Sequence, residues 1–435
     1  MKFLFFRLFL FPSLLLLTLT QCGEKPKIPL PGTRLSVMEA DFTIHQGPDA
    51  DNIAIDVIDP SENDAWPQPG CTPCHLQPHG SSPGLNKVIW DTSIGSGNSD
   101  AWVLTAPLIG AENMIFAMDA RNQISALAAD TGREIWVYEP PHSSKHIGGG
   151  IAYESGFIYG SLADGDIVKL EAKTGKAVWE AKLPYTLRGA PTVTNGHIYV
   201  TSSNNHLIAL SIETGETIWV HTALEESLSF VGGASAAATP FVVLAPYSSG
   251  ELHALHPQSG YSLWSDAIVS LKGLDSKSLI GQLVALPVIS KNMAFVISHS
   301  DQFIAFDLRT GQRLWEKPIG GIQTPVVRED FLFVLTNNND VVCLTRGTGR
   351  IIWVHSLPIY EQKSETKGRI AWTGPILAGK KLIVASSDRQ AVALSVEDGQ
   401  VLETMALPGP VLVPPIVMQN TLYFLTTTGT VVAVQ

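Results

Sequence analysis

Positive charge is scarce in this sequence. It has 29 Lys and Arg residues against 40 Asp and Glu residues, which gives a net charge of −11. A protein with this balance repels phosphate backbones, so nucleic acid is a poor partner. A second long apolar run is also missing. No stretch after the first segment approaches the roughly 20 apolar residues of a spanning helix, so the rest of the chain is not expected to cross a membrane.

Apolar residues and turn-forming residues are plentiful. Hydrophobic residues make up 45% of the chain, which is enough for a large core and excludes general disorder. With 37 Gly, 28 Pro and 8% aromatic residues, the composition favours many strands and turns over a helical bundle.

The first 21 residues have the pattern of an export signal peptide. Lys2 and Arg7 accompany an apolar run that ends at Gln21 and Cys22, and such a segment is a targeting signal rather than part of the fold. Its end resembles the lipobox of bacterial lipoproteins, in which the cysteine becomes the acylated first residue of the mature chain. The resemblance implies a lipid on Cys22, and Gly23 in place of Asp implies sorting to the outer membrane, facing the periplasm. An uncleaved signal anchor is the alternative.

An eleven-residue unit recurs along the chain, and its spacing predicts a β-propeller. In the copy from Ala126 to Trp136, apolar residues alternate on both sides of a Thr-Gly turn, as in a β-hairpin. Another strand pair precedes each copy, so each period holds four short antiparallel strands. The copies start at residues 126, 169, 209, 254, 305, 343 and 393, intervals typical of propeller blades.

The two ends of the repeat region complement each other. An eighth copy begins at Pro414 and stops at Gln435 without its last strand, and residues 88–90 can supply a strand that ends in Trp. We therefore predict an all-β, eight-bladed propeller over residues 83–435, closed by pairing of its ends, which removes exposed edges. Residues 22–82 are rich in Pro and lack the repeat, so we expect a lipid-anchored tether and an entry segment. The tryptophans expected to pack between blades are Trp90, Trp136, Trp179, Trp219, Trp264, Trp315 and Trp353.

Cys71, Cys74 and His75 form the sequence C-x-x-C-H, which is the attachment motif of c-type haem in exported chains. The surrounding segment is rich in Pro and Gly, and only His79 is near as a second ligand. A periplasmic disulfide between Cys71 and Cys74, two free thiols, and haem attachment therefore remain as alternatives. Cys343 occupies the small position of the repeat, where we expect core packing.

The unit A-L-x-x-x-T-G-x-x-x-W resembles the repeat of the pyrroloquinoline-quinone-like propellers, which include quinone-dependent dehydrogenases and a non-enzymatic lipoprotein. With the lipobox and the N-terminal closing strand, the chain is similar to the BamB family, lipoproteins of the outer-membrane β-barrel assembly machinery. Residues 30–37 and 65–68 resemble segments of its alphaproteobacterial members. The resemblance implies a scaffold without cofactor, metal or catalysis. It implies binding to the periplasmic domains of the barrel-inserting protein, and to unfolded outer-membrane protein precursors whose folding and insertion it assists.

In that family, loops on one face bind the barrel-inserting protein, including the connection between the third and fourth blades. By this resemblance the partner-binding residues are Leu228, Phe230, Val231, Gln282 and Val284. Leu228 and Phe230 keep the apolar character of the family positions, whereas Val231 stands in place of an Arg, and Gln282 and Val284 in place of two Asp residues. Packing of Leu228 and Phe230 into the propeller itself is the alternative.

The alternative function is an exported quinone- or haem-dependent oxidoreductase. Alcohol-oxidising members of the superfamily carry two adjacent cysteines beside the cofactor, and no two cysteines are adjacent here. The blades also lack an Asp-rich loop that could supply the oxygen ligands of calcium. The sequence therefore favours the scaffold.

Overall fold

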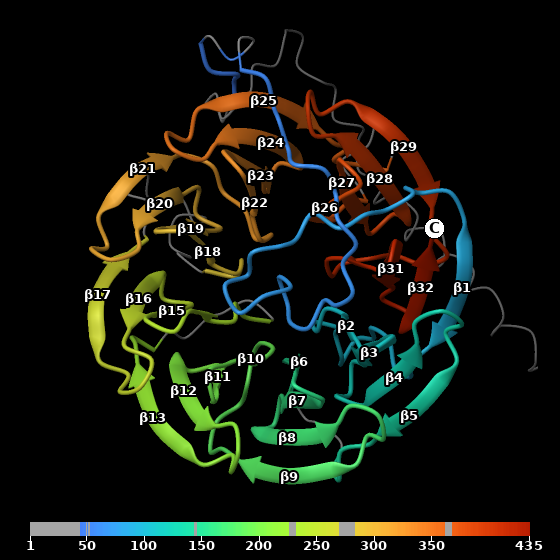
Figure 1. Cartoon of the computed structure of the whole chain (residues 1–435), viewed down its shortest axis with the longest axis vertical. Coiled ribbons are helices and arrows are strands. Elements are labelled where there is room, and N and C mark those ends of the chain that lie inside the picture. The colour runs from blue at the N-terminus through green and yellow to red at the C-terminus, as the bar shows by residue number, and fades with distance from the viewer. Residues whose placement is uncertain are drawn as a thin grey trace, which may run out of the picture. The chain divides into compact units, whose positions relative to one another are not determined.

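The computed structural model describes residues 44–48, 50, 53–142, 146–225, 232–268, 283–361 and 368–435. Residues Ile44–Gln435 form one unit, in which eight four-stranded antiparallel sheets stand in a ring (Figure 1). This arrangement confirms the predicted eight-bladed propeller. None of the described residues belongs to a helix long and apolar enough to cross a membrane.

Each blade runs from an inner strand at the centre of the ring to an outer strand on its rim (Figure 1). The inner strands are β2 (Ile109–Ala111), β6 (Gly149–Glu154), β10 (Thr192–Thr194), β14 (Ala237–Ala238), β18 (Val288–Ser290), β22 (Val326–Arg328), β26 (Trp372–Ala378) and β30 (Ile416–Met418). The second strands are β3 (Met114–Met118), β7 (Phe157–Leu162), β11 (His197–Thr201), β15 (Val243–Pro246), β19 (Met293–Ile297), β23 (Phe331–Leu335), β27 (Lys381–Ser386) and β31 (Thr421–Leu425).

The third strands are β4 (Ile124–Ala128), β8 (Asp166–Glu171), β12 (His206–Ser211), β16 (Glu251–Leu255), β20 (Phe303–Asp307), β24 (Asp340–Thr345), β28 (Gln390–Ser395) and β32 (Thr430–Val434). The outer strands are β5 (Glu134–Tyr138), β9 (Ala177–Lys182), β13 (Thr217–Thr222), β17 (Ser262–Ala267), β21 (Arg313–Lys317), β25 (Ile351–Ser356), β29 (Val401–Ala406) and β1 (Val88–Ser93). Blades 1 to 7 are numbered from β2–β5 to β26–β29, and blade 8 combines β30, β31 and β32 with β1.

Blade 8 is built from two distant parts of the chain. β1 pairs antiparallel with β32, with Trp90 opposite Ala433 and Asp91 opposite Val432. Next to this pairing, Lys87 and Gln435 exchange two backbone hydrogen bonds of 2.9 and 3.0 Å. The N-terminal strand therefore supplies the missing fourth strand and closes the ring.

The repeated tryptophan stands opposite the small residue of its unit and leans on the next blade. Trp219 pairs with Ala209, and its Nε1 donates to the carbonyl of Pro257 at 2.8 Å. Its ring lies so close to Gly260 that a Cβ there would come within 2.7 Å. Equivalent contacts join Trp90 to Gly132, Trp136 to Gly175, Trp179 to Gly215, Trp264 to Gly311, Trp315 to Gly349 and Trp353 to Gly399.

Blade 7 has Glu403 where the other blades have this tryptophan, opposite Ala393. The next blade has no turn between its third and fourth strands, because β32 is the last strand and β1 comes from the N-terminal side. A tryptophan would therefore find no turn glycine to pack on. Glu403 instead accepts a hydrogen bond from the backbone N–H of Leu85 at 2.7 Å and pairs with Lys381.

Residues 61–80, named here the strap, lie over the centre of the ring (Figure 1). Each inner strand has a strand neighbour on one side only, and among the described residues the strap bonds to the other side in every blade except blade 6. Its bonds to the inner strands or the residues beside them are Trp66 with Gly110 (2.7 and 2.9 Å), Tyr153 N to Pro67 O (2.7 Å), Gln68 with Val193 (2.7 and 3.0 Å), Ala238 N to Pro73 O (2.8 Å), Ile289 N to Cys74 O (2.9 Å), Gly379 N to Gly80 O (2.9 Å) and Asn63 Nδ2 to Val417 O (3.0 Å). The strap thus pairs edge groups that would otherwise face the centre unbonded. The expectation of a tether and entry segment did not include this docking.

Candidate functional site

The C-x-x-C-H sequence forms a partly buried turn of the strap, in which Cys71 and His75 are buried and Cys74 is half-buried. Cys71 Sγ lies 3.7 Å from the carbonyl oxygen of Ala65, and Cys74 Sγ lies 3.3 Å from that of Ala238 on β14. Both residues are free cysteines, so the structure does not contain the disulfide that the sequence left open. Burial raises the pKa of the Cys71 thiol to about 12 and also raises the pKa of Cys74. Neither thiol is therefore a ready nucleophile in this state.

His75 also makes a structural contact. The residue is 1% exposed, and its Nδ1 bonds to the carbonyl of Pro287 at 2.8 Å. Burial lowers its pKa to about 4, although the bond to Pro287 favours the charged form. A haem would need both thiols and the imidazole on one open side of the strap, and here they face three separate carbonyls inside the protein. The C-x-x-C-H residues do not fit haem in this arrangement.

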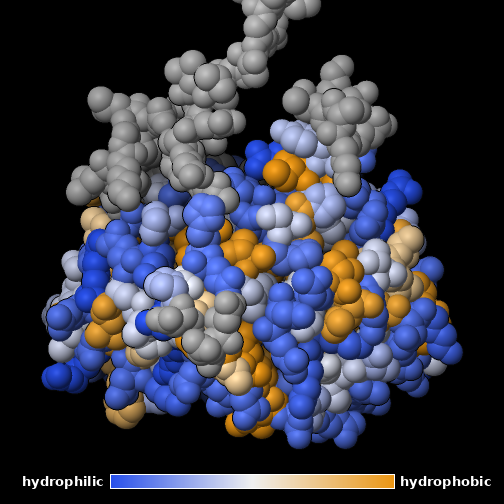
Figure 2. Space-filling model, turned by 90° about the horizontal axis from the view of Figure 1, so that it is seen from above, coloured by the Kyte–Doolittle hydropathy of each residue, from blue (hydrophilic) through white to orange (hydrophobic). Residues whose placement is uncertain are grey.

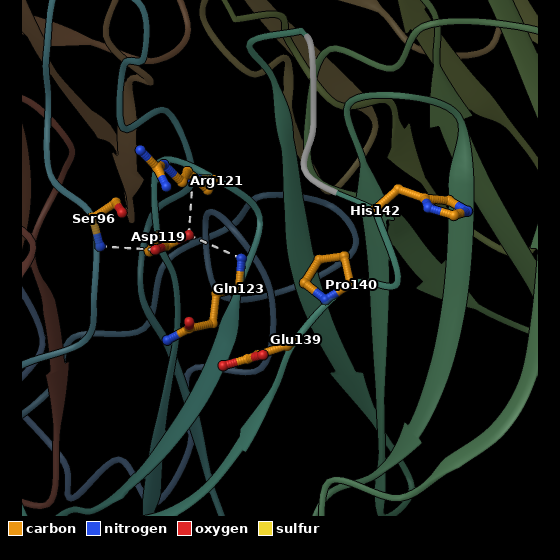
Figure 3. Close-up of a pocket in the computed structure, with 7 residues that line it drawn as sticks. All are labelled: Ser96, Asp119, Arg121, Gln123, Glu139, Pro140 and His142. Carbon is orange, nitrogen blue, oxygen red and sulfur yellow. Dashed lines mark hydrogen bonds between the residues drawn. The ribbon is translucent and has the colours of Figure 1, made fainter.

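A pocket opens where the connection after β1 meets the turn between β3 and β4 (Figure 3). Its lining residues are Ser96, Asp119, Arg121, Gln123, Glu139, Pro140 and His142. Asp119 is 4% exposed, and its carboxylate accepts backbone N–H bonds from Ser96, Arg121 and Gln123 at 2.8 to 2.9 Å. These donors hold the carboxylate in the turn, so Asp119 ties the connection to the turn.

The same turn has a hydroxyl cap in other blades. The oxygens of Ser202, Thr336 and Ser386 accept the N–H four residues later, from His206, Asp340 and Gln390, at 3.0 to 3.1 Å. Asp119 caps the N–H of Gln123 with the same spacing. The pocket is thus shaped by a repeated turn, and its acidic residue has a structural task. Among the described residues, no group of three or more His, Cys, Asp or Glu side chains could hold a metal ion.

The ring has two distinct faces. Because the strands of each blade are antiparallel, every connection from an outer strand to the next inner strand leaves on the same face, named here the connection face. The strap bonds beside turns on the opposite face, the strap face. Asn63 O accepts from Gln419 N in the turn between β30 and β31 at 2.8 Å, and His79 Nε2 accepts from Lys380 N in the turn between β26 and β27 at 2.9 Å.

The connection between blades 3 and 4 is held firmly at its described ends. Leu224 donates its N–H to Glu251 Oε2 at 2.9 Å and accepts at its carbonyl from Asn205 Nδ2 at 2.6 Å. At the other end, Ser235 Oγ donates to the carbonyl of Ala190 at 2.7 Å. The Leu224 side chain is 69% exposed even though its backbone is fixed. This connection therefore presents an apolar side chain from a rigid base.

A polar cluster of Glu251, His221, Tyr247 and His253 lies beside the fixed backbone of Leu224. Burial alone would raise the pKa of Glu251, but the N–H of Leu224 and the Ser249 hydroxyl hold it below its ordinary value. The neighbouring His221 bonds through Nδ1 to Tyr247 Oη at 2.7 Å, and burial together with His253 lowers its pKa. Near neutral pH the carboxylate is thus charged and the His221 imidazole neutral, which suits their bonds.

By chain position, the predicted partner-binding residues belong to the connections between blades 3 and 4 and between blades 4 and 5. Leu228, Phe230, Val231 and Gln282 lie outside the described residues, so their placement stays a prediction. Val284 is half-buried at the end of the connection between blades 4 and 5.

Three asparagines that the sequence analysis did not identify tie blades to these connections. Each stands at positive φ, between 58 and 67°, in a turn between second and third strands, a conformation that Asn tolerates. Asn122 Nδ2 donates to Gly148 O at 3.0 Å, Asn205 Nδ2 to Leu224 O at 2.6 Å, and Asn339 Nδ2 to Pro358 O at 3.2 Å. An asparagine just before the third strand in three of the repeats was the sequence pattern that could have identified these residues.

Eight four-stranded blades, seven of which place a tryptophan on a turn glycine of the next blade, define a propeller of the pyrroloquinoline-quinone-like class. A family model described as "Outer membrane protein assembly factor BamB" matches residues 120–355, more than half of the chain. The chain therefore belongs to the BamB family.

Individual relatives are distant. The outer membrane protein assembly factor BamB of Yersinia pestis is 23% identical over 242 residues, a match that covers 54% of this chain and 61% of that relative. The crystal structure of BamB from Moraxella catarrhalis has a TM-score of 0.65 at 21% identity, covering 80% of this chain and 100% of that one. A europium-containing methanol dehydrogenase has a TM-score of 0.65 at 14% identity, covering 84% and 89%. These two structural likenesses show the fold alone.

Proposed function

We propose that the protein is a non-enzymatic lipoprotein scaffold of outer-membrane β-barrel assembly, of the alphaproteobacterial type. Cys22 would carry the lipid and hold the propeller at the periplasmic side of the outer membrane. The observation that carries the proposal is the match of more than half of the chain to the BamB family model. The export signal and the lipobox-like sequence before Cys22 support the location.

The barrel-inserting protein is the proposed partner, and the connection face is its proposed site. The strap covers inner-strand edges toward the opposite face, whereas the connection between blades 3 and 4 offers Leu224 with its side chain 69% exposed. An apolar side chain held on a fixed backbone costs little entropy to bury, which favours it as an interface contact. Leu228 and Phe230 follow within the same connection.

Affinity capture from detergent-solubilised envelopes tests this site. The double variant Leu228→Ala and Phe230→Ala should lose on the order of 2 to 4 kcal/mol of binding to the barrel-inserting protein, the range of hot-spot residues, and should keep its melting temperature. The matched control is Phe241→Ala with Tyr261→Ala, two residues 82% and 78% exposed in turns of blade 4 on the strap face. This control should capture the partner normally. A loss of stability in place of binding would show that Leu228 and Phe230 pack into the propeller.

Unfolded barrel precursors are the second proposed partner, and they can bind by adding an extended segment to a strand edge. The strap bonds inner edges, whereas each outer strand on the rim has a strand neighbour on one side only. Among the described residues, Gly47 N bonds to Ile351 O on the outer strand β25 at 2.9 Å, and no such backbone bond reaches β13, whose outer edge is open to such pairing. β13 suits it best, because it contains no Asp, Glu, Lys or Arg, and Ile218 and Val220 are 45% and 42% exposed. Uncharged exposed edges are templates for strand pairing. On the side of the ring seen in Figure 2, apolar patches reach the surface between polar ones.

The oxidoreductase alternative is tested by absorbance. A haem or quinone bound to the purified protein gives visible or near-ultraviolet bands, whereas a scaffold without cofactor absorbs only through its aromatic residues. Bands that persist through dialysis would contradict the non-enzymatic proposal.

A further inference from the structure

Cys71 and Cys74 lie where the strap passes from blade 3 to blade 4. On one side of them, Gln68 exchanges two hydrogen bonds with Val193 on β10, at 2.7 and 3.0 Å. On the other side, Ile289 of blade 5 donates to the Cys74 carbonyl at 2.9 Å. The scaffold proposed above makes no use of this cysteine pair.

We propose that the strap is a redox-sensitive latch. It docks on the inner strands with Cys71 and Cys74 as thiols, and a disulfide between them forms only when this part of the strap has left the ring. The disulfide then prevents redocking. This inference concerns the strap face and does not depend on the proposed partner.

In the docked strap the two sulfurs contact different carbonyl oxygens and do not form a bond with each other. Cys74 Sγ faces outward to Ala238 O at 3.3 Å, whereas Cys71 Sγ faces Ala65 O within the same N-terminal segment at 3.7 Å. The backbone of Cys71 has a φ of 75°, and its N–H donates to Gln68 O at 2.8 Å. A non-glycine residue keeps such a φ only where its surroundings impose it. A bond between the sulfurs would take both away from their acceptors and relax this turn.

The docked state also protects the thiols chemically. Thiol–disulfide exchange needs a thiolate and access to it, and in the docked strap Cys71 is buried and Cys74 half-buried. An undocked strap exposes two ordinary thiols three residues apart. Exported compartments oxidise such thiols. The oxidant therefore reacts with the undocked strap, and docking slows oxidation because it lowers the population of the undocked state.

The chemical step balances with a disulfide-bearing protein or oxidised glutathione as oxidant. The thiolate of one strap cysteine attacks the oxidant disulfide, forms a mixed disulfide and releases one thiol. The second strap cysteine then attacks the mixed disulfide, forms the Cys71–Cys74 bond and releases the second thiol. The two strap thiols lose two electrons and two protons, and the oxidant gains both as two thiols.

The test uses the full-length protein with dithiothreitol or with oxidised glutathione. Hydrogen exchange follows the amides of Ala238 and Ile289, which donate to the strap at 2.8 and 2.9 Å, and mass spectrometry locates disulfides and alkylated thiols. We expect a Cys71–Cys74 disulfide under oxidation, with exchange of both amides at least about tenfold faster, as local opening produces. The variant Cys71→Ser with Cys74→Ser can keep both bonds to the carbonyls and should exchange equally slowly under both conditions.

Cys343 serves as an internal control, because it is 0% exposed on β24 in the core. Cys71 and Cys74 should be alkylated faster than Cys343, and Gln68→Ala should speed this further. The matched variant Gln123→Ala, which loses a side-chain bond to Ile94 O of 3.0 Å on the connection face, should not. Strap thiols that react no faster than Cys343, a disulfide that never forms, or a disulfide in protein whose Ala238 and Ile289 amides stay protected would each overturn the proposal.

Discussion

Gly260 gives a sharp test of how the blades hold one another. It stands at a φ of +69°, and a Cβ added to it would lie 2.7 Å from ring atoms of Trp219. In Gly260→Ala the left-handed backbone costs about 1 to 2 kcal/mol. The ring must also move away, which weakens its Nε1 bond to Pro257 O, a bond worth about 1 kcal/mol. With lost ring packing, we expect the free energy of unfolding to fall by about 3 to 4 kcal/mol.

Gly196→Ala is the matched control for backbone strain. Gly196 has a φ of +78°, and a Cβ there would meet no atom within 4 Å. Its substitution should therefore cost only the strain, about 1 to 2 kcal/mol. Urea denaturation followed by far-ultraviolet circular dichroism measures both variants, and tryptophan fluorescence reports the displaced ring. Equal losses in the two variants would refute the account of packing between blades.

Three further predictions concern closure and anchoring. Trp90→Ala removes the contact of β1 with blade 1 and should lower the stability of the whole ring cooperatively by about 3 kcal/mol, the lower range for a packed tryptophan; an unchanged thermal melt would contradict closure through β1. Cys22→Ser should release the protein from outer-membrane fractions or stall its processing, and firm retention there would mean another anchor. Burial would raise the pKa of Glu403, but Lys381 and the N–H of Leu85 hold it below its ordinary value. The stabilisation relative to Glu403→Gln should therefore be present at pH 7 and decline as pH falls below about 4.3, the ordinary Glu pKa. Urea denaturation of both proteins at pH 7 and below the ordinary Glu pKa of about 4.3 checks this. A difference in unfolding free energy that stays the same at the two pH values would exclude it.

The blades could be predicted from the sequence because their information is local. Alternating apolar residues, a turn glycine and a tryptophan at fixed spacing define each hairpin, and Trp90 opposite Ala433 repeats the pair that Trp219 forms with Ala209. The unfinished last repeat likewise pointed to the closing strand.

The strap could not be predicted, because its contacts are not local. Gln68 bonds to Val193, 125 residues away, and no periodicity links such partners. A Pro-rich segment without a repeat has the same composition whether it is solvated or docked against strand edges. Composition therefore indicated a tether and could not show that residues 61–80 dock on the inner strands.

Lys169 makes a contact between blades that the repeat likewise does not predict. It occupies the small position of its repeat, and its Nζ donates to Ile212 O at 3.2 Å and lies 4.4 Å from the centre of the Phe157 ring. In the preceding blade contact, Trp136 Nε1 bonds to the equivalent carbonyl, that of Ala172, at 2.8 Å. Trp179 Nε1 has no hydrogen-bond partner among the described residues. The repeat predicts the position of the tryptophan. Whether the tryptophan or Lys169 donates to the carbonyl of the next blade depends on packing between blades, which the repeat does not encode.

The most direct test of the proposed function is capture of the barrel-inserting protein on the connection face. The full-length protein and its Leu228→Ala, Phe230→Ala variant are each used as bait in detergent-solubilised envelopes, and the captured partner is quantified. The scaffold proposal expects strong capture by the unaltered protein and a loss of about tenfold or more in the variant, with equal melting temperatures. Capture that is equally strong in the folded variant, or no capture by the unaltered protein, would contradict it.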